Sequence, residues 1–259
     1  MRIGMYSPYV PKHFGGGEKH FFDVALSLAK KHQVFVGIPS NNNQLSEKTI
    51  AHVREQYSQF LNRSLKKLHF VACPFGTAAF SLNKIFWTHQ FDAFYAVTDG
   101  SLFFSLAKQN YLHIQVPFTH SMKSPLNRLK LANWQHINTN SFFTKSVIEK
   151  SWQTQVETVI QPMVATDQLH VKLDDLGLKE KIILNVGRFF KQLHCKRQDV
   201  LVRAFAELLS RYPDVSTQWR LVLIGSVEDR AYARQVAQLA KKLPVTILHE
   251  VTRSELNAW

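Results

Sequence analysis

Three short motifs in the sequence carry groups that could bind phosphate or move a proton. The first is the glycine run Gly15–Gly17, followed by Glu18, between the first expected strand and the first expected helix. Glycines such as Gly15 and Gly16 allow a close backbone approach and a positive φ, and a helix N-terminus offers N–H groups to an anion. The spacing matches neither Gly-x-Gly-x-x-Gly nor a Walker loop. The run therefore indicates either a phosphate site or a flexible strand-to-helix turn.

The second motif places two basic side chains after the apolar stretch 182–186. Arg188 stands at the carboxyl end of this expected strand, where open α/β sheets bind ligands. Lys196 falls at the start of the next expected helix, where a cation is unfavourable unless it serves an anion. A planar guanidinium and an ammonium suit the two phosphates of a diphosphate. A solvated basic loop fits the same spacing.

The third motif, Val116-Pro117-Phe118-Thr119-His120, ends on a histidine beyond another apolar strand. A histidine there can donate to a ligand or exchange a proton at physiological pH. A loop histidine without function is the commoner case among the 12 histidines of the chain, but its position singles out His120. The histidines kept in reserve are His13, His20, His194 and His249.

The sequence lacks the motifs of common metal sites and of serine hydrolases. The sequence has no His-Glu-x-x-His pair, so we expect no metal, and no Gly-x-Ser-x-Gly elbow of a serine hydrolase. Cys73 and Cys195 are far apart, which predicts free structural thiols in a reducing compartment.

The apolar runs are too short for a membrane span, and the apolar stretch at the start of the chain is too short for a signal peptide. We expect a cytoplasmic protein, free or peripheral on the inner face of a membrane.

The charge is strongly basic in an otherwise ordinary globular composition. The 259 residues carry a net charge of +13, and residues 1–165 hold 17 Lys and Arg against 8 Asp and Glu. This excess suggests a phosphorylated ligand, an anionic membrane or nucleic acid. Nucleic acid is disfavoured because the chain has no stacking motif and no helix-turn-helix signature. Candidate membrane contacts, with a solvated basic face as the alternative, are Lys66, Lys67, Lys123, Arg128 and Lys130, near Phe118, Leu126 and Leu129.

Apolar runs alternate with helical patterns along the chain, which predicts an α/β fold with parallel sheets and right-handed crossovers. The clearest helices are 18–31 and 199–211, and a surface helix is expected within 41–64. The expected strands are 2–6, 33–38, 68–71, 93–97, 111–116, 137–140, 158–160, 182–186, 221–224 and 246–248.

The alternation of expected strands and helices is interrupted once, which predicts two domains. We place the first at 1–162, a linker at 163–180 and the second at 181–259. The second has only three expected strands and two full helices, and a capping-box pattern at Thr252 and Glu255 predicts a further helix just before the chain ends. Because a parallel sheet needs covering on both faces, we expect the second domain to be incomplete.

Taken in order, the motifs resemble the retaining GT-B glycosyltransferases of family 4, the glycosyl transferases group 1 proteins. The resemblance runs over essentially the whole chain and is most specific at ILNVGRFFKQLHCKRQDVLVRAFAELL, which is similar to the family's Val-Gly-Arg … Lys-x-x-Asp pattern. The segments GGGEKHFFDVALSLAKKHQVFV, TNSFFTKSVIEKSW, LVLIGSVED and VTILHEVTRSEL take their family order around it. The GRFF variant also resembles lipid-linked-oligosaccharide mannosyltransferases.

The resemblance implies two Rossmann-like domains and an enzyme that moves a sugar, with retention and without a metal or other cofactor, to a glycan or lipid-linked acceptor. The donor would be a nucleotide-diphosphate sugar, with mannose or another hexose transferred. Arg188 and Lys196 would hold the donor diphosphate, Gly15 and Gly16 would bring backbone amides to it, and His120 would lie near the transferred sugar.

The sequence departs from the family at its end. Family members carry a Glu-x7-Glu motif that would fall beyond Trp259, and Glu250 and Glu255 precede its place. The resemblance therefore implies a chain truncated at its C-terminus. The alternative to an active transferase is a non-catalytic remnant or partner subunit that keeps the fold.

Overall fold

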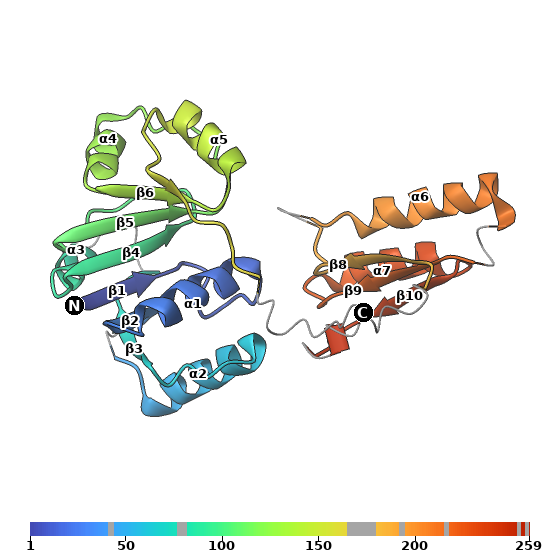
Figure 1. Ribbon diagram of the computed structural model, residues 1–259, viewed down its shortest axis with the longest axis horizontal. Coiled ribbons are helices and arrows are strands. Elements are labelled where there is room, and N and C mark those ends of the chain that lie inside the picture. The colour runs from blue at the N-terminus through green and yellow to red at the C-terminus, as the bar shows by residue number, and fades with distance from the viewer. Residues whose placement is uncertain are drawn as a thin grey trace. The chain divides into compact units, whose positions relative to one another are not determined.

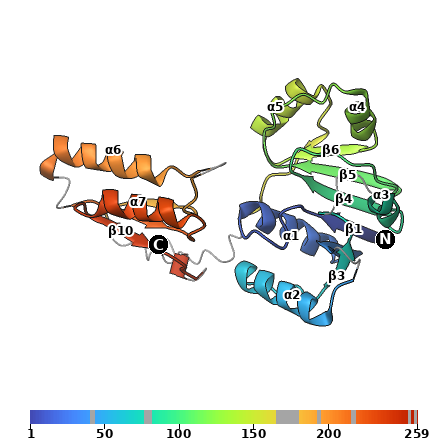
Figure 2. The same ribbon diagram turned by 180° about the vertical axis from the view of Figure 1, so that it is seen from behind.

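The computed structural model of the protein describes residues 1–40, 44–76, 82–164, 180–191, 195–214, 218–252, 255–256 and 259. The chain divides into two compact units, Met1–Val164 and Ala165–Trp259 (Figures 1 and 2). Most of the predicted linker, residues 165–179, lies outside the described residues. The carbonyl of Met163 accepts a hydrogen bond from Lys19 at 3.2 Å, which ties residue 163 to the first unit.

A seven-stranded parallel sheet forms the centre of the first unit, in the order β3-β2-β1-β4-β5-β6-β7. Its register pairs Ile3 with Val34 on one side and with Ala93 on the other. The strands are β1 (Arg2–Tyr6), β2 (Gln33–Pro39), β3 (Leu68–Cys73), β4 (Ala93–Thr98), β5 (Gln109–Ile114), β6 (His136–Thr139) and β7 (Thr158–Val159).

Alternate residues of the central strands face two different cores. Tyr95 and Val97 of β4 pack with α1 and α2, whereas Phe94 and Ala96 pack with side chains of α4 and α5. Figures 1 and 2 both show α4 and α5 side by side at the β6 end of the sheet. The helices are α1 (Gly16–Leu28), α2 (Glu47–Leu61), α3 (Leu82–Thr88), α4 (Pro125–Ala132) and α5 (Phe142–Trp152).

Serine caps set the starts of three of these helices. The hydroxyls of Ser46, Ser124 and Ser141 each accept a hydrogen bond from a backbone N–H three residues later, at 3.1–3.2 Å. Each cap satisfies a donor that the first helical turn leaves unpaired. The predicted surface helix within 41–64 is confirmed as α2, although residues 41–43 lie outside the described residues.

The second unit holds a three-stranded parallel sheet of β8 (Ile182–Val186), β9 (Arg220–Ile224) and β10 (Val245–Leu248), in the order β10-β9-β8. Helices α6 (Gln198–Arg211) and α7 (Arg230–Ala240) pack together on one face, with Val202 and Val236 in the same apolar cluster as Leu221. The predicted capping box is confirmed, because Thr252 Oγ1 accepts from the Glu255 N–H at 3.2 Å and the Glu255 carboxylate accepts from the Thr252 N–H at 2.6 Å.

All ten predicted strands are present, and the parallel α/β fold class is confirmed. The largest shift is at β5, which begins at Gln109 and ends at Ile114 instead of spanning 111–116. The Gln109 N–H bonds to the Asp92 carbonyl, and a turn from Val116 to Phe118 around Pro117 ends the pairing. Among the described residues, no helix is both long and apolar enough to cross a membrane, and both cysteines are free thiols.

Candidate functional site

The strand order of the first sheet reverses between β1 and β4, so the loops beyond these strands diverge at its carboxyl edge. Ligands of open α/β sheets bind at such a switch point. Tyr9 lies in the loop after β1 and Asp99 in the loop after β4. Burial, together with the nearby carboxylates of Asp99 and Glu18, raises the pKa of Tyr9. The loops after β1 and β4 and the start of α1 therefore come together at this edge.

The glycine run caps α1 in a conformation that needs no positive φ. Gly15 is extended, with φ of −145°, and its N–H donates to the Glu18 carboxylate at 2.8 Å. The close approach occurs at Gly17 instead, where a Cβ would lie 2.5 Å from Gln115 Oε1. A Cβ on Gly16 would meet nothing within 4 Å. The open side of the turn, where a ligand has room, is therefore at Gly16.

A line of hydrogen bonds fixes this turn to the ends of β5 and β6. Gln115 Nε2 donates to the Gly17 carbonyl at 3.3 Å, and Asn140 Nδ2 donates to the Gln115 carbonyl at 2.9 Å. Thr144 on α5 then donates to Asn140 Oδ1 at 2.9 Å. These residues were not predicted from the sequence. The available signal was their position, because Gln115 and Asn140 each follow an apolar strand.

His120 lies exposed in the loop after β5, beside the loop after β4. Its Nε2 pairs with the Gly100 carbonyl at 3.3 Å, and its ring centroid is 5.8 Å from that of Trp152. Gly100 has a φ of +101°, and a Cβ there would lie 3.0 Å from His120 Cε1, so only glycine fits. The neighbouring Asp99 accepts hydrogen bonds from the N–H and hydroxyl of Ser101. Asp99 is a second polar group at this edge that the sequence analysis missed.

The reserve histidines take different places. His13 is exposed, and its carbonyl accepts from Tyr57 at 2.7 Å. His20 is buried, with its ring centroid 4.8 Å from that of His113, so it is a core residue of α1. His249 lies just after β10, where Nδ1 pairs with the Gly225 carbonyl at 3.2 Å. His194 lies outside the described residues.

The second unit brings the two predicted cations to the carboxyl end of β8. Arg188 Nη1 lies 3.2 Å from both carboxylate oxygens of Glu228, and its guanidinium lies 5.3 Å from the Phe190 ring centroid. Lys196 is exposed, and its stem covers Gly187, where a Cβ would lie 2.6 Å from Lys196 Cγ. No described carboxylate pairs with Lys196. The edge thus presents one oriented guanidinium and one ammonium that no described carboxylate pairs with, which suits an anion with two charged groups.

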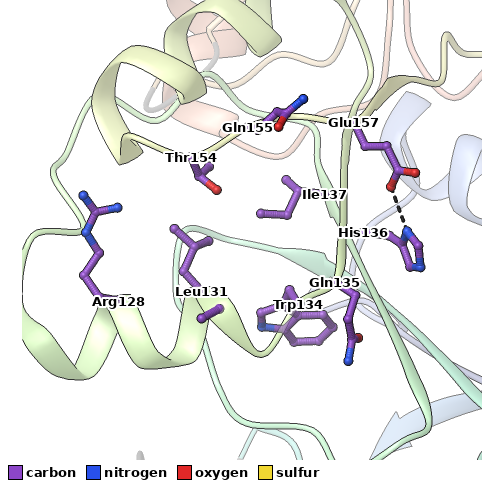
Figure 3. Close-up of a pocket in the computed structure, with 10 residues that line it drawn as sticks. Arg128, Leu131, Trp134, Gln135, His136, Ile137, Thr154, Gln155 and Glu157 are labelled. Atoms are coloured by element: carbon purple, nitrogen blue, oxygen red, sulfur yellow. Dashed lines mark hydrogen bonds and ion pairs between the residues drawn. The ribbon is translucent and has the colours of Figure 1, made fainter.

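A cavity of ≈ 480 Å³ lies elsewhere on the first unit, between the end of α4, the start of β6 and the connection from α5 to β7 (Figure 3). It contains none of the residues predicted to bind the donor diphosphate or to lie near the sugar. Arg128 on its wall caps α5 by donating to the carbonyls of Trp152 and Gln153, and His136 pairs with Glu157 at 2.7 Å. Because it opens at the amino edge of β6, the cavity is separate from the carboxyl-edge loops.

The described part of the chain holds no group of three or more His, Cys, Asp and Glu side chains that could ligate a metal. The carboxyl edge of the first unit offers backbone amides and a histidine, and the carboxyl edge of the second unit, taken by itself, offers two cations. Such preorganised groups stabilise charge that develops on a leaving group.

Known proteins resemble this chain over part or nearly all of its length. No family model matches. A Neurospora crassa protein named GDP-Man:Man(3)GlcNAc(2)-PP-Dol alpha-1,2-mannosyltransferase is 29% identical over 140 residues, covering 47% of this chain and 24% of that protein. The match therefore spans about a quarter of the relative's length.

Three solved structures illustrate the similarity in fold. Trehalose-6-phosphate synthase OtsA superposes with a TM-score of 0.57 at 13% identity, over 99% of this chain and 75% of its own. The galactosyltransferase WaaB superposes with a TM-score of 0.54 at 14% identity, over 96% of this chain and 68% of its own. UDP-GlcNAc 2-epimerase from Neisseria meningitidis superposes with a TM-score of 0.53 at 13% identity, over 100% of this chain and 75% of its own. The predicted GT-B type of fold, built from Rossmann-like units, is confirmed, but a fold shared with an epimerase does not by itself define the reaction.

Proposed function

We propose that the protein is a glycosyltransferase that takes a sugar from a nucleotide-diphosphate donor. The observation that carries the proposal is the pair of cations, Arg188 and Lys196, at the carboxyl end of β8. A diphosphate leaving group gains negative charge as the sugar departs, and fixed cations stabilise it. Lys196 has no described carboxylate partner, so its charge is available to an anion. The GT-B fold and the similarity to a mannosyltransferase support the same class of reaction.

The finer features of the reaction follow from the family resemblance. We propose transfer with retention, without a metal or other cofactor, of mannose or another hexose to a glycan or lipid-linked acceptor in the cytoplasm. The name of the Neurospora crassa relative supports mannose. In the first unit, backbone amides of the Gly15 and Gly16 turn would serve a phosphate. The Gly15 N–H donates to Glu18, so the amide at Gly16, where a Cβ would meet nothing within 4 Å, is the one that carries this proposal. His120 would act close to the transferred sugar, because its imidazole is exposed and held at the carboxyl edge.

The test is a donor screen followed by substitution of the two cations. GDP-, UDP- and ADP-hexoses are offered to the protein, and release of the nucleoside diphosphate is measured with water or an added glycan as acceptor. With the active donor, Arg188→Ala and Lys196→Ala should each lower kcat/KM by about 30- to 1000-fold, the effect of losing about 2–4 kcal/mol of transition-state stabilisation. Arg203→Ala, which removes an exposed cation of α6, is the matched control and should leave kcat/KM unchanged.

Two results would contradict the proposal. Wild-type rates in both cation variants would remove these side chains from the donor site. Donor binding without release of nucleoside diphosphate would instead favour the alternative, a non-catalytic protein that keeps the fold.

We also propose that α4 contacts an anionic membrane. Leu126 and Leu129 of this helix are 51% and 63% exposed, and Lys123 and Lys130 lie beside them. Apolar side chains flanked by cations favour an anionic lipid surface. The other predicted basic contacts do not extend this surface. The Arg128 side chain caps α5. Lys66 and Lys67 lie before β3, at the opposite edge of the sheet.

Sedimentation with vesicles tests the α4 surface. Binding should rise with the fraction of phosphatidylserine, and it should fall when Leu126 and Leu129 are both replaced by Ser. Equal sedimentation with neutral and anionic vesicles would contradict the proposal.

A further inference from the structure

A buried hydroxyl in the second unit joins α7 to the start of α6. The Tyr232 side chain is 2% exposed, and its oxygen lies 2.9 Å from Asp199 Oδ1 and 3.3 Å from Gln198 Oε1. It also accepts from the Asp199 N–H at 3.2 Å. A phenol has one proton to donate, so the two side-chain acceptors share it while the oxygen accepts from the backbone. Tyr232 therefore fixes both of the first two residues of α6.

Gln198 extends this contact to the loop that carries Arg188. Its side chain is fully buried, and its Nε2 donates to the carbonyls of Gly187 at 2.9 Å and Arg188 at 3.1 Å. Both protons of one amide thus bind the backbone carbonyls on either side of the Arg188 Cα. Since Gln198 lies two residues after Lys196, the same side chain holds the segments that carry both cations.

We propose that Gln198 and Tyr232 are positioning residues that set Arg188 and Lys196 for a nucleoside diphosphate. The proposal rests on the proposed function of these two cations. A small misplacement of an aligned cation weakens its contact with a bound anion, because charge-assisted hydrogen bonds need a narrow geometry. The positions of both cations depend on one buried amide and on the phenol that orients it.

The alternative is that this network only stabilises the core. Apolar side chains could fill the same space, and burying a glutamine amide is costly unless its polar atoms are paired. Here Gln198 donates both amide protons to backbone carbonyls beside a candidate ligand site rather than within a helix or sheet. A fully satisfied buried polar network of this kind holds a backbone in one arrangement.

The experiment compares Tyr232→Phe with Val236→Ala. The first variant keeps the ring and removes only the hydroxyl. The second truncates a fully buried side chain one turn later on α7, which lowers stability without touching the network. Titration calorimetry with GDP and with UDP gives the affinity of each folded variant, and hydrogen exchange follows the backbone amides of residues 187–190.

We expect Tyr232→Phe to weaken binding of the preferred nucleoside diphosphate by about tenfold and to speed exchange at residues 187–190. Val236→Ala should lower the Tm and leave both quantities at wild-type values. Gln198→Glu, which cannot donate to the two carbonyls, should behave like Tyr232→Phe.

The results separate the positioning role from the proposed function. If wild-type protein binds nucleoside diphosphate and Tyr232→Phe binds it equally well, the positioning role is wrong while the function stands. The same conclusion follows if Val236→Ala weakens binding as much as Tyr232→Phe does. If wild-type protein binds neither GDP nor UDP, the proposed function fails and the positioning role falls with it, whatever the exchange rates show.

Discussion

Acidification should destabilise the first unit through His113. This side chain of β5 is fully buried, and its neighbours are the His20 ring from α1, the Tyr95 ring from β4 and Asn138 Oδ1 from β6. Burial lowers the pKa of His113 from 6.5 to about 4, although the hydrogen bond that His113 Nδ1 donates to Asn138 Oδ1 opposes the shift. Burial also lowers the pKa of His20. The folded protein therefore keeps this pair neutral where an unfolded chain would protonate it.

Proton linkage gives the direction and the magnitude of this change in the free energy of unfolding. Below pH 6.5 the unfolded chain binds more protons at His113 than the folded protein does, so the free energy of unfolding falls as the pH drops. The loss from His113 alone is about 2 kcal/mol at pH 5 and approaches about 3 kcal/mol near pH 4. Below the pKa that His113 has in the folded protein, this side chain no longer changes the free energy of unfolding as the pH falls. His20 acts in the same direction.

Urea unfolding between pH 7.5 and pH 4.5, followed by hydrogen exchange of β4 to β6 peptides, measures this dependence. His113→Leu should remove about 2.5 kcal/mol of the change in unfolding free energy over this pH range, whatever it does to stability at pH 7.5. His52→Gln, at an exposed position of α2, is the control and should keep the wild-type slope. An unchanged slope in His113→Leu would refute the assignment of the acid sensitivity to this buried side chain.

Two glycines give sharper tests of packing. Gly225→Ala would place a Cβ 2.1 Å from the Gly187 carbonyl oxygen, so thermal unfolding should show the second unit destabilised by at least about 3 kcal/mol; an unchanged Tm would contradict this contact. Gly17→Ala would place a Cβ 2.5 Å from Gln115 Oε1 and should cost about 1–3 kcal/mol in urea unfolding of the first unit. Gly16→Ala, which meets open space, should cost far less, and equal costs would show that the α1 turn is packed differently.

The elements were predictable because their signals are local. Each strand is a short apolar run, and the stripe of apolar side chains along 199–211 predicted α6 nearly to its ends. Position at a strand end was also what singled out Arg188 and His120 as candidates. The structure places both in loops beyond the carboxyl ends of their strands.

The partners of these residues were not predictable, because they depend on contacts between distant parts of the chain. Glu228 reaches Arg188 across 40 residues, and Gln115 meets Gly17 across 98. The same limit explains the glycine run, where the sequence analysis singled out Gly15 and Gly16 although the close contact is at Gly17. Which glycine approaches β5 is decided by how α1 packs on the sheet, and no local spacing encodes that.

The proposed function depends on Arg188 and Lys196 binding the diphosphate of a nucleotide sugar. A crystal structure of the protein with GDP or UDP tests it most directly. We expect phosphate oxygens within about 2.7–3.2 Å of the Arg188 guanidinium and the Lys196 ammonium. A diphosphate bound away from both side chains, for example in the cavity beside Arg128, would contradict the assignment of these two cations.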